Sequence, residues 1–422
     1  MRTFSGPVVP IALAIALVGC GAKTGLDVPD ATVDAGMDAG TDASIPCLEL
    51  PPDGGIIDLP LATDVVLARA DIVFAVDTTG TMSDELDRIR RDLRDRIAPA
   101  IQRTIADSRL GVTSFADFPV EGCGTASAGD SPFRLHTPVT DDLARVQVGL
   151  DSIALGNGAD DIEAQVEAAY QIATGEGVGT WVPASFGCPG GGFGYPCFRT
   201  DAVPIVLMFS DAPFHNGPRG VNPYSAPDAC PSVADVAHTF DEATAALEAG
   251  GIRVIGLYSG PPGGAGRDHL AALADATGAI DAEGRPLVFD IGRRGERLSE
   301  SVIDAIAQFA DVIEFDVIDT VLVDPDPTDG IDPRELVGSV LAVSAEPSTG
   351  VREVAREAGE FRGVQTGTRV LFQLDVRGGV TMPGPPRRVL LEVVFRGDGT
   401  RLGSTVVELV IGGECDDPLL TP

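Results

Sequence analysis

The chain has 422 residues, with 63 acidic against 30 basic side chains and a formal net charge of −33. This excess of negative charge repels phosphate backbones and anionic lipid surfaces, so the composition argues against nucleic-acid binding and against docking on anionic lipid. Divalent cations remain compatible with it. Without its N-terminal segments the chain keeps about 375 residues, enough for two or three domains.

The N-terminus has the pattern of a processing segment. Arg2 gives a basic start, and residues 11–18 form an apolar run. The run is shorter than the roughly 20 apolar residues that a spanning helix needs, so residues 1–20 are predicted to be a signal peptide. Leu17-Val18-Gly19-Cys20 resembles the lipobox of bacterial lipoproteins. The resemblance implies lipidation (palmitate) of Cys20 and anchoring in the cell envelope, at the outer membrane or cell surface. An ordinary secretory signal is the alternative.

Residues 21–46 repeat Asp-Ala-Gly and contain few large apolar side chains. Such a segment cannot bury enough surface to offset its ordering entropy, so it is predicted to be a disordered acidic tether. At about 5–6 Å × √n it reaches some 25–30 Å.

Six cysteines remain beyond Cys20, and an even number in an exported chain favours disulfides. Cys188 and Cys197 are expected to close their glycine-rich loop, and Cys47 and Cys415, which flank the folded part, are candidates for a clasp. Pairing between Cys123 and Cys230 stays open.

Residues 66–310 show apolar strands alternating with amphipathic helices, a pattern typical of a doubly wound, mainly parallel sheet flanked by helices. The expected strands are residues 71–76, 109–118, 202–209, 251–258 and 287–291, and the expected helices are residues 84–105, 143–153, 162–174, 233–249, 268–277 and 298–309.

From residue 311 to 415 the hydrophobic period changes to two, which predicts an antiparallel β-sandwich. The expected strands are residues 312–323, 337–343, 369–376, 389–395 and 404–411, with a turn at Asp398-Gly399 and a short helix near residues 351–358.

Asp77, Thr79 and Thr81 follow the first α/β strand directly. Ligands bind at the carboxyl ends of strands in open α/β sheets, so these side chains are expected to face a binding crevice. A carboxylate and two hydroxyls suit Mg²⁺ or Ca²⁺ and do not suit zinc.

Further acids are expected at the same edge of the sheet: Asp84, Glu85, Asp117, Asp160, Glu163 and Asp211. Such a cluster repels itself unless a cation is present. Capping of the helix N-terminus is the alternative role for Asp84 and Glu85.

This arrangement resembles the von Willebrand factor A superfamily and, more narrowly, the metal-binding (I-like) domain of integrin β subunits. The resemblance implies a metal-ion-dependent adhesion site (MIDAS) with Mg²⁺ or Mn²⁺, and Ca²⁺ as a candidate at neighbouring sites. It assigns the primary ion to Asp77, Thr79, Thr81, Glu163 and Asp211, an adjacent ion to Asp84 and Glu85, and a third ion to Asp117, Asp160 and the shared Glu163. The sequence departs from the family pattern at Gly158, Ile162 and Glu85.

By the same resemblance, the chain is expected to be a non-enzymatic cell-adhesion lipoprotein that binds an acidic group of a protein or glycan ligand through its metal. Its four histidines are dispersed, and no nucleophile elbow or phosphate loop is found. The alternatives are an assembly subunit whose metal braces loops and a metal-assisted hydrolase.

Overall fold

The computed structural model describes residues 45–156, 159–226, 229–379 and 386–415. The predicted signal peptide, Cys20 and nearly all of the predicted tether lie outside these residues. Within the described residues, no helix combines the length and the apolar character that a membrane crossing requires.

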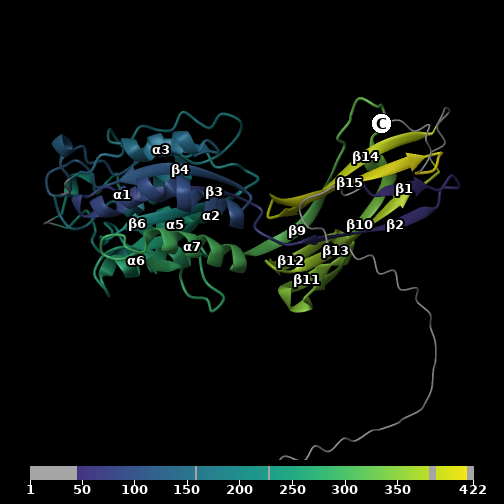
Figure 1. The fold of residues 1–422 in the computed structure, drawn as a ribbon. Helices are drawn as coiled ribbons and strands as arrows, with labels where there is room; N and C mark the ends of the chain where they lie inside the picture. Colours follow the sequence, from purple (N-terminus) through teal and green to yellow (C-terminus); the bar gives the residue numbers. More distant parts are fainter. Residues whose placement is uncertain (1–44, 157–158, 227–228, 380–385, 416–422) are drawn as a thin grey trace, which may run out of the picture. The chain divides into compact units, whose positions relative to one another are not determined.

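The α/β part contains a sheet with the strand order β5-β4-β3-β6-β7-β8 (Figure 1). All of its strands run parallel except β5, which lies antiparallel to β4 at one edge. The central strands β3 and β6 are buried almost throughout, which explains their continuous apolar sequences. The bounds are β3 (Arg69–Asp77), β4 (Asp107–Phe115), β5 (Arg134–Thr140), β6 (Val203–Ser210), β7 (Arg253–Tyr258) and β8 (Val288–Asp290).

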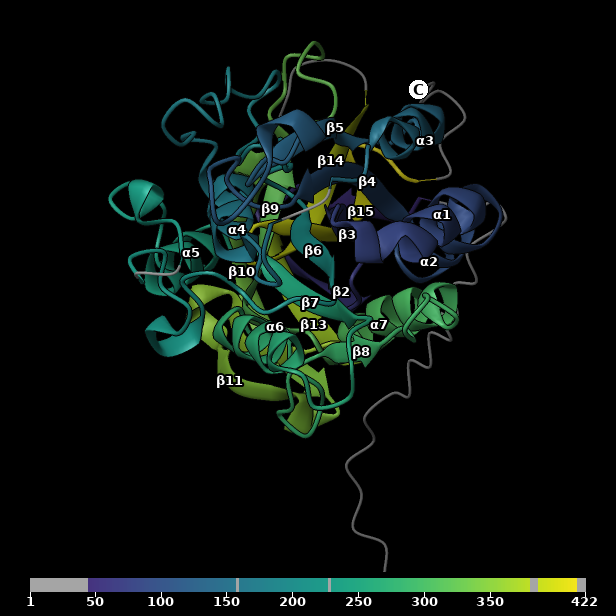
Figure 2. The same ribbon diagram turned by 90° about the vertical axis from the view of Figure 1, so that its left-hand side faces the viewer.

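Helices cover both faces of this sheet (Figure 2). Ile72, Phe74 and Val76 of β3 share one core with α1, α2, α3 and α7, whereas Val73 and Ala75 share the other with α4, α5 and α6. This alternation follows from the period of two along a strand. The bounds are α1 (Ser83–Asp92), α2 (Ala98–Thr104), α3 (Leu143–Ser152), α4 (Gln165–Thr174), α5 (Phe240–Ala249), α6 (Ala265–Ala276) and α7 (Leu298–Val312).

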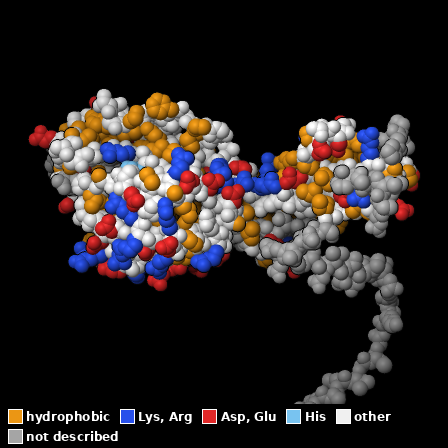
Figure 3. Space-filling view, turned by 45° about the horizontal axis from the view of Figure 1, so that its top comes forward, with side chains coloured by type: hydrophobic (Ala, Val, Ile, Leu, Met, Phe, Trp, Pro, Cys, Tyr) orange, Lys and Arg blue, Asp and Glu red, His pale blue; other side chains and the backbone are white. Residues whose placement is uncertain are grey.

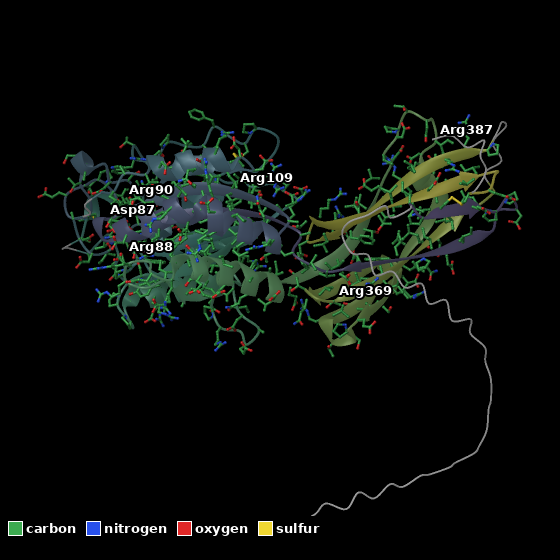
Figure 4. The ribbon with its side chains drawn as sticks, viewed as in Figure 1. Asp87, Arg88, Arg90, Arg109, Arg369 and Arg387 are labelled. Atoms are coloured by element: carbon green, nitrogen blue, oxygen red, sulfur yellow. A yellow bond between two sulfur atoms is a disulfide. The ribbon has the colours of Figure 1, made fainter. Side chains whose placement is uncertain are left out.

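The predicted helices differ from the structure by up to three residues at an end, and two of them differ more. The helix expected over residues 84–105 is divided into α1 and α2 by a π-helical turn, Leu93–Ile97. The helix expected from residue 233 begins at Phe240, because Thr239 and Glu242 form a reciprocal capping box there. Arg90 of α1, labelled in Figure 4, donates to the backbone oxygens of Leu150 and Ile153 and so links α1 to the end of α3.

The β-rich part contains two sheets, with strand orders β1-β15-β14-β9-β12-β11 and β10-β13-β2. All strand pairs are antiparallel except β1 with β15. The bounds are β1 (Cys47–Leu50), β2 (Ile56–Asp64), β9 (Glu314–Val323), β10 (Val337–Glu346), β11 (Val351–Ala355), β12 (Glu360–Gln365), β13 (Arg369–Arg377), β14 (Arg387–Gly397) and β15 (Thr400–Ile411).

Strands β1 and β2 were not predicted, and they precede the α/β part in the chain. The short helix expected near residues 351–358 is only partly present, as a 3-10 turn at Arg356–Ala358. The residues before it form β11, which pairs with β12, and Glu353 lies opposite Arg362 with 3.4 Å between their charged groups. The predicted turn at Asp398-Gly399 is confirmed as a two-residue hairpin with positive φ at both residues (49° and 80°).

Three disulfides connect the described chain, and all three had been considered from the sequence. They join Cys188 to Cys197, Cys47 to Cys415, and Cys123 to Cys230. The last pair, left open by the sequence, connects the loop after β4 to the segment that follows Tyr224.

Candidate metal-binding site

Asp77, the last residue of β3, is fully buried and its carboxylate is held on both oxygens. Oδ1 accepts from the backbone nitrogen and the hydroxyl of Thr79, at 2.9 and 2.8 Å. Oδ2 accepts from the hydroxyl of Ser210 at 2.8 Å. The carboxylate therefore has a fixed orientation at the carboxyl end of the sheet.

Two threonines and a second aspartate extend this arrangement. The hydroxyls of Thr79 and Thr81 lie 3.2 Å apart, and the Thr81 hydroxyl donates to Asp211 Oδ1 at 3.3 Å. Asp211 comes directly after β6, which pairs with β3 up to Val76 and Phe209, so both aspartates emerge at neighbouring strand ends. Thr81 is exposed, which leaves one side of the cluster open to solvent.

Glu163 is brought to the same edge by backbone hydrogen bonds on both sides. Its nitrogen donates to the oxygen of Pro213 (3.0 Å), its oxygen accepts from the nitrogen of His215 (2.9 Å), and the next nitrogen, of Ala164, donates to Ala116 (3.0 Å). The side chain is 2% exposed, and its Oε2 has no hydrogen-bond partner among the described residues.

These carboxylates strongly favour a nearby positive charge. Burial, and next the negative charge of Asp211, raise the pKa of Asp77 to about 7. Burial, followed by the charges of Asp77 and Asp117, raises the pKa of Glu163 to about 11. A buried carboxylate stays ionised when a cation compensates it. The donor set, carboxylates with two hydroxyls and no sulfur or imidazole, fits a hard divalent cation.

The two acids assigned to an adjacent ion lie in the first turn of α1 but differ in environment. Glu85 is fully buried, neither carboxylate oxygen has a hydrogen-bond partner among the described residues, and burial raises its pKa to about 7. Asp84 is exposed and lies 3.8 Å from Arg294. Neither side chain forms a hydrogen bond that caps the helix.

Asp117 and Asp160, assigned to a third ion, are brought together around His215. The Nε2 atom of His215 lies 3.1 Å from Asp117 Oδ2 and 3.2 Å from Asp160 Oδ2. Burial lowers the pKa of His215, but the hydrogen bonds and charges of the two aspartates outweigh it and raise the pKa to about 9. The sequence had suggested His215 only as a loop residue near the site.

A possible metal-binding group of different chemistry lies at the same place. Ligand atoms of Asp117, His215, Cys123 and Cys230 all fall within 4.8 Å of one another. The two sulfurs are bonded to each other, so neither is available as a thiolate in this state.

Three polar residues near the site were not predicted. Ser210 holds Asp77, and Gln165 in turn donates to the Ser210 hydroxyl at 2.9 Å. Asp130 is 5% exposed; its Oδ2 accepts from the nitrogen of Thr125, and its Oδ1 has no hydrogen-bond partner among the described residues. The position of Ser210 beside Asp211 was a usable signal, whereas Asp130 lies in an insertion without any pattern.

The part of the chain from β3 to α7 is thus a doubly wound α/β domain, with polar side chains gathered at the carboxyl ends of β3, β4 and β6. The predicted fold class is confirmed, including the antiparallel β-rich region that accompanies this domain.

No family model and no curated protein matches the sequence. Among solved structures, the chain is similar to a von Willebrand factor type A protein from Catenulispora acidiphila, at 13% identity and a TM-score of 0.33, with 89% of this chain and 73% of that chain covered. It is also similar to the pilus adhesin SpaC from Lactobacillus rhamnosus GG in its open conformation, at 12% identity and a TM-score of 0.33, with 86% of this chain and 45% of that chain covered.

Proposed function

We propose that this protein binds a protein or glycan ligand through a divalent cation held at the carboxyl ends of β3 and β6. Asp77, Thr79, Thr81, Glu163 and Asp211 hold the primary ion, Mg²⁺ or Mn²⁺. Asp84 and Glu85 provide an adjacent site for which Ca²⁺ is the candidate. When bound, the primary ion accepts an acidic group of the ligand as a further oxygen donor.

The observation that carries the proposal is the orphaned carboxylate of Glu163. A buried carboxylate oxygen without a partner is costly, and Glu163 lies where the negative charge of Asp77 acts on it. A cation between them removes both costs. In this site Ser210 orients Asp77, and the exposed Thr81 lies on the solvent-facing side from which a ligand would approach.

The wider role in this proposal comes from the sequence. Lipidation at Cys20 would anchor the protein to a bacterial envelope membrane, and the acidic tether would hold the binding domain away from it. Binding through a metal needs no activated nucleophile, so the proposal is for a binding protein without catalytic activity.

The first test is metal uptake. Calorimetry with Mg²⁺ and Mn²⁺ on the chelator-treated protein is expected to show binding that Asp77→Ala abolishes while the far-ultraviolet circular dichroism spectrum is kept. Asp304→Ala, an exposed change on α7, is the matched control and should bind normally. Unchanged binding by Asp77→Ala would contradict the proposal.

The second test separates adhesion from a purely bracing metal. Bound Mn²⁺ with an open position relaxes the protons of exchanging water, and an aspartate-containing peptide that takes this position lowers the effect. We expect strong relaxation that falls on addition of the peptide. Weak relaxation, insensitive to carboxylates, would instead identify an ion enclosed by protein ligands that only braces the loops.

A further inference from the structure

A pocket of about 620 Å³ lies between β5 and the glycine-rich loop of residues 185–192. Leu135 and Val139 of β5 line it, together with Arg145 of α3. Arg109, labelled in Figure 4, also lines it and is the third residue of β4, near the amino end of that strand. The candidate metal site lies at the carboxyl ends of the strands, so this pocket is a separate place in the domain. Its volume is typical of sites for small ligands.

The loop that covers the pocket is held by bonds within the chain. The disulfide between Cys188 and Cys197 closes it, and the backbone nitrogen of Tyr195 donates to a backbone oxygen of α4 at 3.1 Å. The nitrogen of Val139 donates to the oxygen of Pro196 at 2.8 Å, so the loop already occupies the outer edge of β5 there. An extended peptide therefore cannot add to β5 as a further strand at this point. The pocket suits a compact ligand instead.

The lining of the pocket reverses the charge of the chain. It includes three arginines and one acid, in a protein with 30 basic and 63 acidic residues. The acid, Asp201, forms an ion pair with Arg69. Arg199, one of the three arginines, lies 2.7 Å from the buried carboxylate of Asp71. These two lining residues are thus already neutralised by partners in the chain.

The two remaining arginines have guanidinium groups left for a ligand. Arg145 is exposed and, among the residues that the structure describes, forms hydrogen bonds only through its backbone. Arg109 lies 3.6 Å from the exposed Asp141, which is longer than a hydrogen bond. A guanidinium group binds a carboxylate through two parallel hydrogen bonds. The pocket therefore favours a ligand that carries a carboxylate.

Aromatic and hydroxyl groups complete the lining. Phe186 is fully exposed at the pocket, and Tyr195 lines it as well. The hydroxyls of Thr140, Ser185 and Thr200 belong to the same lining. An aromatic face packs against the C–H groups of a sugar ring, and hydroxyls can both donate to and accept from the hydroxyls of a sugar. Together with the guanidinium groups, this set matches a sugar ring with an acidic substituent.

We propose that this pocket binds a carboxylate-bearing sugar, a uronic acid residue of an acidic glycan. Arg145 and Arg109 bind the carboxylate, and Phe186 packs against the apolar face of the ring. The inference goes beyond the proposed function, because no metal takes part in it. The protein would then recognise an acidic glycan at the opposite end of the sheet from its cation.

Calorimetry with short oligosaccharides of galacturonic or glucuronic acid tests this inference, with EDTA present so that the metal site makes no contribution. The unaltered protein is expected to bind at least one of the two. Arg145→Gln is expected to weaken this binding by roughly 10-fold or more, as for the loss of a hydrogen bond between charged groups. Phe186→Ala should weaken it as well. Both side chains are exposed, so both variants should fold, and Arg103→Gln, an exposed change on α2, is the matched control.

Neutral oligosaccharides of the same length should bind at least 10-fold more weakly than the acidic ones. Equal binding of the neutral sugars, no binding of either acidic oligosaccharide, or unchanged affinity in Arg145→Gln would overturn the inference. Binding of an aspartate-containing peptide in place of the oligosaccharides would also overturn it. Because EDTA is present throughout, failure here leaves the proposed metal-dependent function untouched, and failure of metal uptake leaves this inference untouched.

Discussion

At the scale of single residues, the candidate site depends on side chains that orient its ligands as much as on the ligands themselves. The hydroxyl of Ser210 donates to Asp77, and it accepts from Gln165 and from the backbone nitrogen of Ala212 at 2.9 and 3.1 Å. Because two donors occupy the lone pairs of this oxygen, its own proton points in a fixed direction, toward Asp77. Ser210 therefore determines which lone pairs of Asp77 remain for a cation.

Ser210→Ala is expected to weaken Mg²⁺ affinity by roughly 10-fold, because removal of a group that orients a ligand typically costs 10–100-fold. The fold should be kept, since alanine fits the space. Calorimetric titration with Mg²⁺ measures the effect, and Ser348→Ala, at an exposed position of the β-rich part, is the control. Affinity equal to that of the control would show that Ser210 has no part in orienting Asp77.

At the scale of elements, one histidine of the antiparallel edge strand β5 bridges its two neighbours, β4 and α3. His136 of β5 contacts the hydroxyl of Ser114 on β4 through Nε2 at 2.7 Å and that of Ser152 on α3 through Nδ1 at 2.8 Å. Hydroxyls can donate or accept, so a neutral ring satisfies both contacts. Burial, together with the charge of Arg134, lowers the pKa of His136 to about 4.

This shift predicts a loss of stability on acidification. The folded-state pKa lies below the unfolded value near 6.5, so the contribution is present above pH 6.5 and is lost as the pH falls toward 4. With allowance for partial exposure, it amounts to about 1–2 kcal/mol. Urea unfolding at pH 7 and pH 4.5 should show the free energy of unfolding falling by this much more in the unaltered protein than in His136→Asn. Equal falls would refute the role of His136.

Elements that carry their own hydrophobic period were predicted from the sequence, and elements that lack one were missed. Strands β3 and β6 and the helices α3 and α6 were predicted because each carries its own hydrophobic period. Strand β5 was missed because Arg134–Thr140 contains Pro138 and is only half buried, as suits an edge strand. Asp77, Thr79, Thr81 and Asp211 were predicted as a cluster because a motif follows a strand, whereas the contacts of Ser210 and Tyr224 join chain segments distant in sequence.

At the scale of the whole molecule, the β-rich part is assembled from both sides of the α/β part in the chain. Strand β1 pairs with β15 and β2 pairs with β13, hundreds of residues later, so no local pattern revealed these pairings. The net negative charge is distributed among mixed charges on the surface, and Figure 3 shows acidic and basic side chains next to one another. Pairs such as Arg285 with Asp281, 2.8 Å apart, offset the acidic excess locally.

The disulfide between Cys47 and Cys415 spans 368 positions of sequence and ties β1 to the end of β15. A disulfide closing so long a loop typically stabilises by about 2–4 kcal/mol. Its replacement by two serines is expected to speed amide hydrogen exchange in β1 and at the end of β15 and to lower the melting temperature. The Cys188–Cys197 pair, with a separation of 9, is the matched control and should have a smaller global effect. Equal effects of the two replacements would contradict this account.

The same long-range bond changes what proteolysis can do to this chain. A protease that cuts once in any loop between Cys47 and Cys415 produces two polypeptides that remain a single covalent molecule. One polypeptide carries Cys47 and the other carries Cys415, so the disulfide still joins them. A single nick in one of the glycine-rich loops, where exposed tips are commonly cleaved, would therefore release no fragment until a reductant opened the bond.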